Sequence, residues 1–291
     1  MNHIIGKRSY FEGWYLKQQT GNKSIALIPS FHADADKKIS ARLQIITDQC
    51  SLVVTFSSII VQVKRNHFHI RMGSCIFSDR GCHLSIKEQG INLKGKLCYH
   101  SMTRPAYDIM GPFCFLPGMQ CRHSIFSVNH RVDGKLTLDG EDYLFKNGTG
   151  YIEGDRGHSF PDKYLWTQYN DGNTSIMLAA ASIPILGLSF CGCIGIVWLK
   201  GKEYRIATYL GAKVIYADKK KIIVRQKGSV LSVQLIKGAT HSLQAPVQGN
   251  MGRTIHESLA CTVNYRFTRH GKVLFESVCH NASFEADIYH A

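Results

Sequence analysis

The chain has 291 residues, of which 44% are hydrophobic, and its formal net charge is +14 at pH 7, from 35 Lys and Arg against 21 Asp and Glu. This hydrophobic content excludes an intrinsically disordered chain, and the length suits one large β architecture or two domains, each with its own core. The basic residues are scattered, apart from a short run at residues 219–221, which argues against nucleic-acid binding.

The first fourteen residues lack the apolar segment of a secretory signal peptide, and the ten cysteines are irregularly spaced. We therefore expect a reduced, cytoplasmic protein without a disulfide framework. Residues 121–123 and 191–193 lack the paired Cys-x-x-Cys spacing of zinc sites, so no metal centre is expected. The positive charge keeps peripheral contact with an anionic membrane open as an alternative, and the sequence leaves the oligomeric state open.

An internal repeat runs through the chain. GNKSIAL at residues 21–27 matches GNTSIML at residues 172–178, and each follows a tryptophan-containing strand, at 14–17 and 166–169. Weaker matches continue in the same order, with 55–56 facing 208–209, 73–74 facing 228–229, and 151–153 facing 283–285. We therefore predict two diverged copies, with domains at residues 1–154 and 155–291.

Both copies predict β-structure. Apolar and polar side chains alternate at residues 41–45, 231–235 and 261–267, which is typical of half-buried strands. Asp-Gly pairs at 133–134 and 139–140 stand at hairpin spacing. Because closure removes the unpaired edges of a sheet, we predict an all-β fold with two tandem antiparallel β-barrels that arise from the repeat.

One long apolar segment, residues 176–199, contains no charged side chain and has the length of a membrane span. Its counterpart in the first copy, residues 24–46, contains Asp34 and Asp36, and the segment itself contains Pro184 and Gly187. Proline and glycine fit a hairpin better than a helix, so we predict two strands around an apolar turn. That turn either touches a ligand or a membrane, or packs against the other barrel.

Ionisable groups are concentrated in GYIEGDRGHSFP, residues 150–161. This stretch joins the last predicted strand of the first copy to the first strand of the second copy. Duplicated domains frequently place ligands at their junction, so we expect the functional site there, with Glu12 and Tyr209. A structural ion pair between Asp155 and Arg156 is the competing interpretation.

Several motifs over nearly the whole chain together resemble the tocopherol cyclase family and its bacterial relatives. They are YFEGWYLK at 10–17, MGPF at 110–113, Cys121 with His123, 127–130, GYIE at 150–153 with SFP at 159–161, 166–168, and residues 207–213. The chain differs from the family pattern at Gly154 and Arg156, where the family has lysine and tryptophan. The second difference removes an aromatic residue from the expected prenyl-binding wall.

The resemblance implies a pair of lipocalin-like barrels, related to those of carotenoid hydratases. It also implies a reaction without redox cofactor or metal, so no cofactor is expected. Tocopherol cyclases protonate an alkene of a prenylated hydroquinone, and the phenolic oxygen captures the tertiary cation to close a chroman ring. The expected partner is therefore a hydrophobic or amphipathic small molecule, and a non-catalytic carrier of such a molecule is the alternative function.

This chemistry defines candidate residues, because an alkene is a very weak base. Its donor must be a neutral carboxylic acid in a dry, largely apolar pocket that raises the pKa of the acid and keeps water away from the cation. The candidate acids are Glu12, Glu153 and Asp155. The aromatic side chains that would stabilise the cation are Trp14, Tyr15, Trp166, Tyr169 and Tyr209. The basic side chains that would orient the quinol oxygens are Lys17, Arg156, His158 and Lys213.

Structural roles compete with these assignments. Glu12 could satisfy backbone donors at the start of a strand. Trp14 and Trp166 stand at equivalent places in the two copies, where lipocalin-type barrels place an aromatic plug, so core packing is favoured over ligand contact. His123 and His130 are expected to be satisfied polar side chains rather than catalysts. The loop at residues 104–119 is either a lid or a plain surface connection.

Overall fold

The structure is a computed structural model that describes residues 6–64, 67–116, 119–185, 188–238, 241–247 and 250–287, with side chains outside 184–188 and 241–258. The chain divides into two compact units. The first comprises Met1–Pro105, Met119–Phe160 and Gln244–Arg253, and the second comprises Ala106–Gly118, Pro161–Leu243 and Thr254–Ala291. The predicted boundary after residue 154 lies within the strand Glu141–Gly157, and one division between the two units lies between Phe160 and Pro161.

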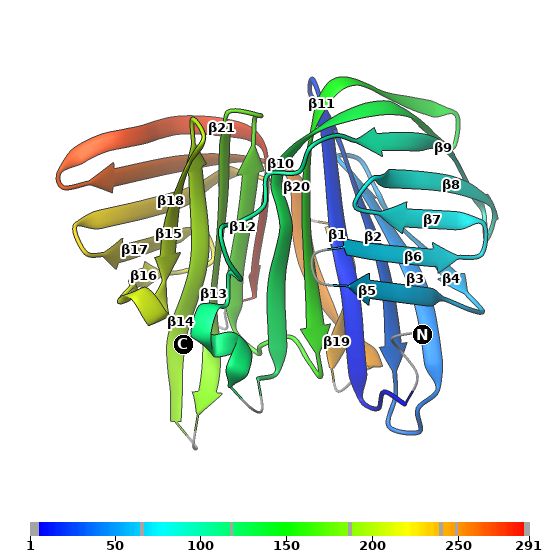
Figure 1. Cartoon of the computed structure of the whole chain (residues 1–291), viewed down its shortest axis with the longest axis horizontal. Helices are drawn as coiled ribbons and strands as arrows, with labels where there is room; N and C mark the ends of the chain where they lie inside the picture. The colour runs from blue at the N-terminus through cyan, green and yellow to red at the C-terminus, as the bar shows by residue number, and fades with distance from the viewer. Residues whose placement is uncertain are drawn as a thin grey trace. The chain divides into compact units, whose positions relative to one another are not determined.

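The first unit contains an antiparallel sheet of eleven strands among the described residues, in the order β4-β3-β2-β1-β11-β10-β9-β8-β7-β6-β5. The strands are β1 (Tyr10–Thr20), β2 (Lys23–Ala33), β3 (Ile39–Thr47), β4 (Ser51–Phe56), β5 (Ile60–Lys64), β6 (His67–Met72), β7 (Cys75–Ser78), β8 (Gly81–Glu88), β9 (Ile91–Tyr99), β10 (Cys121–Leu138) and β11 (Glu141–Gly157). The sheet curls, so that β5 to β8 run across β1 to β3 in Figure 1.

The second sheet, most of which belongs to the second unit, has the same plan, with the described strands in the order β15-β14-β13-β12-β21-β20-β18-β17-β16 and β19 paired to β20. They are β12 (Tyr164–Asn170), β13 (Thr174–Ile185), β14 (Leu188–Leu199), β15 (Lys202–Ala207), β16 (Lys213–Ala217), β17 (Lys221–Gln226), β18 (Ser229–Lys237), β19 (His241–Val247), β20 (Asn250–Arg269) and β21 (Lys272–Asp287). In each unit the first strand lies between the second and the last strand. The all-β prediction is confirmed, and the shared connectivity agrees with the repeat.

Short 3-10 helices, η1 (Gly111–Phe115) and η2 (Thr208–Leu210), are the helical elements of the described residues. Within that part of the chain, no helix has the length and apolar character needed to span a membrane. The apolar segment at 176–199 forms the antiparallel pair β13 and β14, in register from Thr174 and Leu199 to Ile185 and Leu188. The predicted hairpin is therefore confirmed, while its turn at 186–187 lies outside the described residues.

Each sheet buries one face in its own hydrophobic core. In β1, Trp14 and Leu16 belong to the core of the first unit, where Trp14 stacks on Phe68 with ring centroids 6.2 Å apart. Because side chains alternate along a strand, Tyr15 and Lys17 lie on the opposite face. They are nevertheless 8% and 0% exposed. The face of this sheet that is turned away from the core is therefore also buried at these residues, and we call it the polar face of the first unit.

Candidate acid–base site

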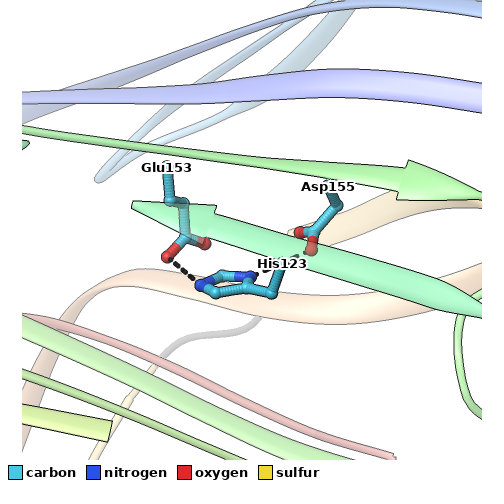
Figure 2. A group of neighbouring side chains, drawn as sticks. All are labelled: His123, Glu153 and Asp155. Atoms are coloured by element: carbon cyan, nitrogen blue, oxygen red, sulfur yellow. Dashed lines mark hydrogen bonds and ion pairs between the residues drawn. The ribbon is translucent and has the colours of Figure 1, made fainter. Parts of the chain in front are cut away.

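A histidine lies between two carboxyl groups on the polar face of the first unit (Figure 2). His123 Nδ1 is 2.9 Å from Asp155 Oδ1, and His123 Nε2 is 3.3 Å from Glu153 Oε2. His123 and Glu153 are buried, whereas 25% of the Asp155 side chain is exposed. A molecule can therefore reach this cluster from the Asp155 side more readily than from the Glu153 side.

The pairing of β10 with β11 builds the cluster. His123 is the cross-strand neighbour of Asp155, and Ile125 is that of Glu153. Glu153 and Asp155 are two residues apart on β11, so both side chains lie on one face of the sheet. On the other side of β11, Glu153 is paired with Tyr15 of β1, which places the cluster on the buried polar face.

The two carboxylates determine the charge of His123. Burial by itself lowers the pKa of the imidazole, but the charges of Asp155 and Glu153 and their hydrogen bonds raise it well above its ordinary value. The ring is therefore an imidazolium at neutral pH. The contact from Nε2 to Glu153, at 3.3 Å, is an ion pair rather than a well-formed hydrogen bond, whereas Nδ1 donates to Asp155.

Tyr151 and Cys121 complete the cluster. The Tyr151 hydroxyl donates to Glu153 Oε2 at 2.5 Å, and burial next to the Glu153 charge raises the tyrosine pKa well above its ordinary value. Cys121 Sγ lies 3.5 Å from Asp155 Oδ1, and burial followed by the Asp155 charge raises the pKa of this thiol. Both groups therefore stay protonated and donate to a carboxylate, and Cys121 does not act as a thiolate nucleophile.

The same three side chains have the composition of a metal site. One ligand atom each from His123, Glu153 and Asp155 lie within 4.8 Å of one another. The carboxylates, however, flank opposite nitrogens of a single ring, so the ring fills the space that an ion bridging both would need. The geometry fits an ion-paired imidazolium better than a metal centre.

The third candidate acid, Glu12, lies on the other face of the sheet. Glu12 and Arg156 are cross-strand neighbours, on the side of Trp14 and the core. The Tyr10 hydroxyl donates to Glu12 Oε2 at 3.3 Å. Because alternation places Asp155 and Arg156 on opposite faces, the segment 150–161 supplies groups to two separate polar clusters.

Other predicted residues of the first unit lie away from the cluster or at its edge. Trp14 is packed in the core. His158 is exposed, and its Nδ1 lies 2.6 Å from the Ser9 carbonyl oxygen. Lys17 is fully buried on the polar face, as the cross-strand neighbour of Tyr151. The structure thus brings Glu153 and Asp155 together with Tyr15 and Lys17 on one face.

The remaining candidates belong to the second unit. Trp166 is buried and paired with Glu285, while Lys213 is exposed. Tyr169 donates to Asp171 Oδ2 at 3.1 Å and packs on Tyr265. Tyr209 donates to the Ile109 carbonyl at 3.0 Å and accepts from Arg205 at 3.2 Å, so it holds part of the 104–119 loop.

His123 is the main residue that sequence reasoning did not nominate. It was expected to be a satisfied polar side chain, and the structure places it at the centre of the carboxyl cluster. The available signal was the Cys121 and His123 pair, one of the motifs on which the resemblance to the tocopherol cyclase family rests. Its pairing with Asp155 was not visible, because it depends on the register of β10.

The architecture is that of lipocalin-like barrel proteins. Among solved structures, the crystal structure of CghA with Sch210972 aligns with a TM-score of 0.63 and 10% identity, covering 96% of this chain and 88% of that chain. The crystal structure of kievitone hydratase from Nectria haematococca aligns with a TM-score of 0.51 and 9% identity, covering 98% and 92%. At such identities the likeness shows the fold alone. No family model and no curated protein sequence matches the chain.

Proposed function

We propose that the chain is an acid–base catalyst that protonates an alkene of a hydrophobic small molecule at His123, Glu153 and Asp155. The reaction would be a cyclisation of the tocopherol cyclase type. The observation that supports this most is the buried imidazolium hydrogen-bonded to a carboxylate that is itself partly exposed. A proton is thereby held next to the more exposed of the two carboxylates.

The proton leaves through Asp155. It moves from His123 Nδ1 to Asp155 over their 2.9 Å hydrogen bond, and then to one alkene carbon, where the π electrons form the new C–H bond. The neighbouring carbon becomes a tertiary cation, which the added negative charge of the cluster stabilises. The phenolic oxygen forms the C–O bond and returns its proton to Asp155. The product is therefore an isomer of the substrate, and the cluster regains its starting state.

Glu153 has a different role in this mechanism. It is buried and accepts from Tyr151, which fixes its carboxylate beside His123 Nε2. We infer that Glu153 positions the ring and maintains its positive charge before transfer. Capture of the cation by water in place of the phenol would give hydration, the reaction that the name kievitone hydratase denotes for a protein of similar fold.

The test is turnover of a prenylated hydroquinone in D2O. Wild type should yield a chroman with one deuterium on carbon, and Glu153→Gln and Asp155→Asn should lower the rate by about 10² to 10⁴. Glu285→Gln is the matched control, because Glu285 is a buried glutamate that accepts from Tyr164 in the second unit. It should keep the wild-type rate.

Two results would contradict this function. Equal rates in wild type and in the Glu153 and Asp155 variants would remove these acids from the mechanism. A hydrophobic molecule found bound by native mass spectrometry, in a wild-type protein that incorporates no deuterium, would favour the carrier function instead.

A further inference from the structure

A second buried polar cluster lies on the same face of the first unit, on β2 and β3. We call Ser30, His32 and Arg42 the Arg42 cluster. His32 Nε2 is 3.3 Å from Ser30 Oγ, and Ser30 Oγ is also 3.3 Å from the Arg42 carbonyl oxygen, to which it donates. Ser30 and His32 are only 4% and 3% exposed. The cluster therefore places a guanidinium beside buried, neutral polar groups.

Two nitrogens of this cluster have unused hydrogen-bonding capacity. Within the described part of the chain, His32 Nδ1 and Arg42 Nε are buried and have no hydrogen-bond partner. Ser30 Oγ gives its proton to the Arg42 carbonyl oxygen, so the neutral His32 ring donates from Nε2 to Ser30, and its Nδ1 is an acceptor. Arg42 Nε–H is a donor, so leaving it unpaired is costly, and a ligand oxygen would remove that cost. Burial, followed by the Arg42 charge, lowers the pKa of His32 to about 3. The imidazole is therefore neutral, and the Arg42 cluster carries a single positive charge.

One row of cross-strand neighbours joins the Arg42 cluster to the acid–base site. His123 is paired with Asp155, Asp155 with Gly13, Gly13 with Ser30, and Ser30 with Arg42. Gly13 has no side chain, so nothing of β1 stands in this row between Asp155 and Ser30. Three strand spacings put the Cα atoms of Asp155 and Arg42 roughly 14 Å apart. One elongated molecule can therefore contact both.

We propose that the Arg42 cluster binds a carboxylate of the substrate, while the reacting alkene of the same molecule lies at Asp155. This assignment rests on the proposed function, and it narrows the substrate to an elongated amphipathic acid. A guanidinium presents two parallel N–H donors, which match the two oxygens of a carboxylate. A single positive charge suits this monoanion better than a phosphate dianion.

The experiment measures binding of decanoate and of 1-decanol, which differ in the head group, by isothermal titration calorimetry at about 0.15 M ionic strength. Wild type should bind decanoate more tightly than 1-decanol. Arg42→Met should weaken decanoate binding by about 10- to 100-fold and leave 1-decanol binding nearly unchanged. Arg71→Met is the matched control, because it removes the same charge from an exposed position on β6.

A wild type that binds both probes equally, or neither, overturns the proposal. If Arg42→Met weakens the binding of both probes equally, the proposal is also overturned, because the substitution would then act through lost packing rather than through lost recognition of the carboxylate. If Arg42→Met does not fold, Arg42→Lys decides, and it should keep the preference for decanoate at severalfold lower affinity. This experiment measures binding and no turnover, so failure of the acid–base mechanism would not change its result. Conversely, a chain that cyclises a neutral substrate would fail this binding test although its proposed function holds.

Discussion

The last strands of the two units each carry a buried glutamate, Glu153 in β11 and Glu285 in β21. Each is paired with an aromatic residue of the first strand of its unit, Tyr15 or Trp166. Each also accepts a hydrogen bond from a tyrosine, from Tyr151 in the first unit and from Tyr164 in the second. The repeat has therefore produced the same buried acid twice.

The two units differ in the residues that the neighbouring strand, β10 or β20, places opposite this glutamate. In the first unit Ile125 is paired with Glu153, and His123 lies two residues earlier, in ion-pair contact with that glutamate. In the second unit the residue of β20 paired with Glu285 is another glutamate, Glu257. Among the residues whose side chains the structure describes, this duplicated acid is ion-paired with an imidazolium in the first unit. Substitutions at His123, and at matched residues of the second unit, show whether His123 sets the properties of the first unit's acid.

The largest expected effect is that of His123→Phe on stability. Removing the imidazolium leaves Glu153 and Asp155 facing each other across an apolar ring, and breaking a buried ion pair by removing one partner costs about 3 to 5 kcal/mol. The free energy of unfolding, measured in urea, should fall by about this amount. Adding Glu153→Gln should restore part of it, because one of the two uncompensated charges is removed. A loss below about 1 kcal/mol would show that the cluster is not the buried ion pair described here.

A smaller effect is expected from the tyrosines. Tyr151→Phe and Tyr164→Phe each remove a donor to a buried carboxyl, which costs about 1.5 to 3 kcal/mol. Tyr151 shares Glu153 with His123, so Tyr151→Phe and His123→Phe should be non-additive in a double-mutant cycle. Tyr164 acts on a different glutamate, so its cycle with His123 should be additive. Equal coupling in both cycles would contradict the assignment of His123 to the first unit's cluster alone.

The sequence predicted local features well, because strand alternation is a local property. The hairpin of β13 and β14 and the all-β class both followed from it. The prediction that Trp14 and Trp166 stand at equivalent positions of the repeat is wrong by one residue. The turns at Gly21 and Gly172 are 151 residues apart, so the position equivalent to Trp166 is Tyr15. Trp14 consequently faces the core, whereas Trp166 lies beside Glu285.

The partner of His123 could not be predicted for a similar reason. The tight turn after Leu138 pairs it with Glu141, and that register, continued unchanged, would oppose His123 to Arg156. Irregularities between Gly134 and Ile125 shift the register by a net one residue, so that His123 opposes Asp155 instead. A one-residue shift moves a side chain to the other face of a sheet. Bulges of this kind have no clear signal in the sequence, and the acid–base cluster depends on them.

The pH dependence of stability gives the smallest effect and the most direct test of the charge on His123. Its pKa is raised in the folded state, so its ion pairs stabilise the fold fully below about pH 6.5, where the unfolded histidine is also protonated. Above that pH the folded chain keeps a proton that the unfolded chain loses. The stability advantage of wild type over His123→Gln should therefore decline, by about 1.4 kcal/mol per pH unit, until the folded pKa is passed.

The pH dependence of the free energy of unfolding must be measured as a difference between wild type and His123→Gln, because His32 also changes the stability with pH. His32, whose pKa is lowered to about 3, destabilises the fold as the pH falls below about 6.5, but it does so equally in both proteins and cancels. Tyr164→Phe is the matched control from the second unit, and its difference from wild type shows how much pH dependence arises outside the His123 cluster. A His123 advantage that grows with pH would mean that the ring is neutral when folded, and no proton would then be stored beside Asp155.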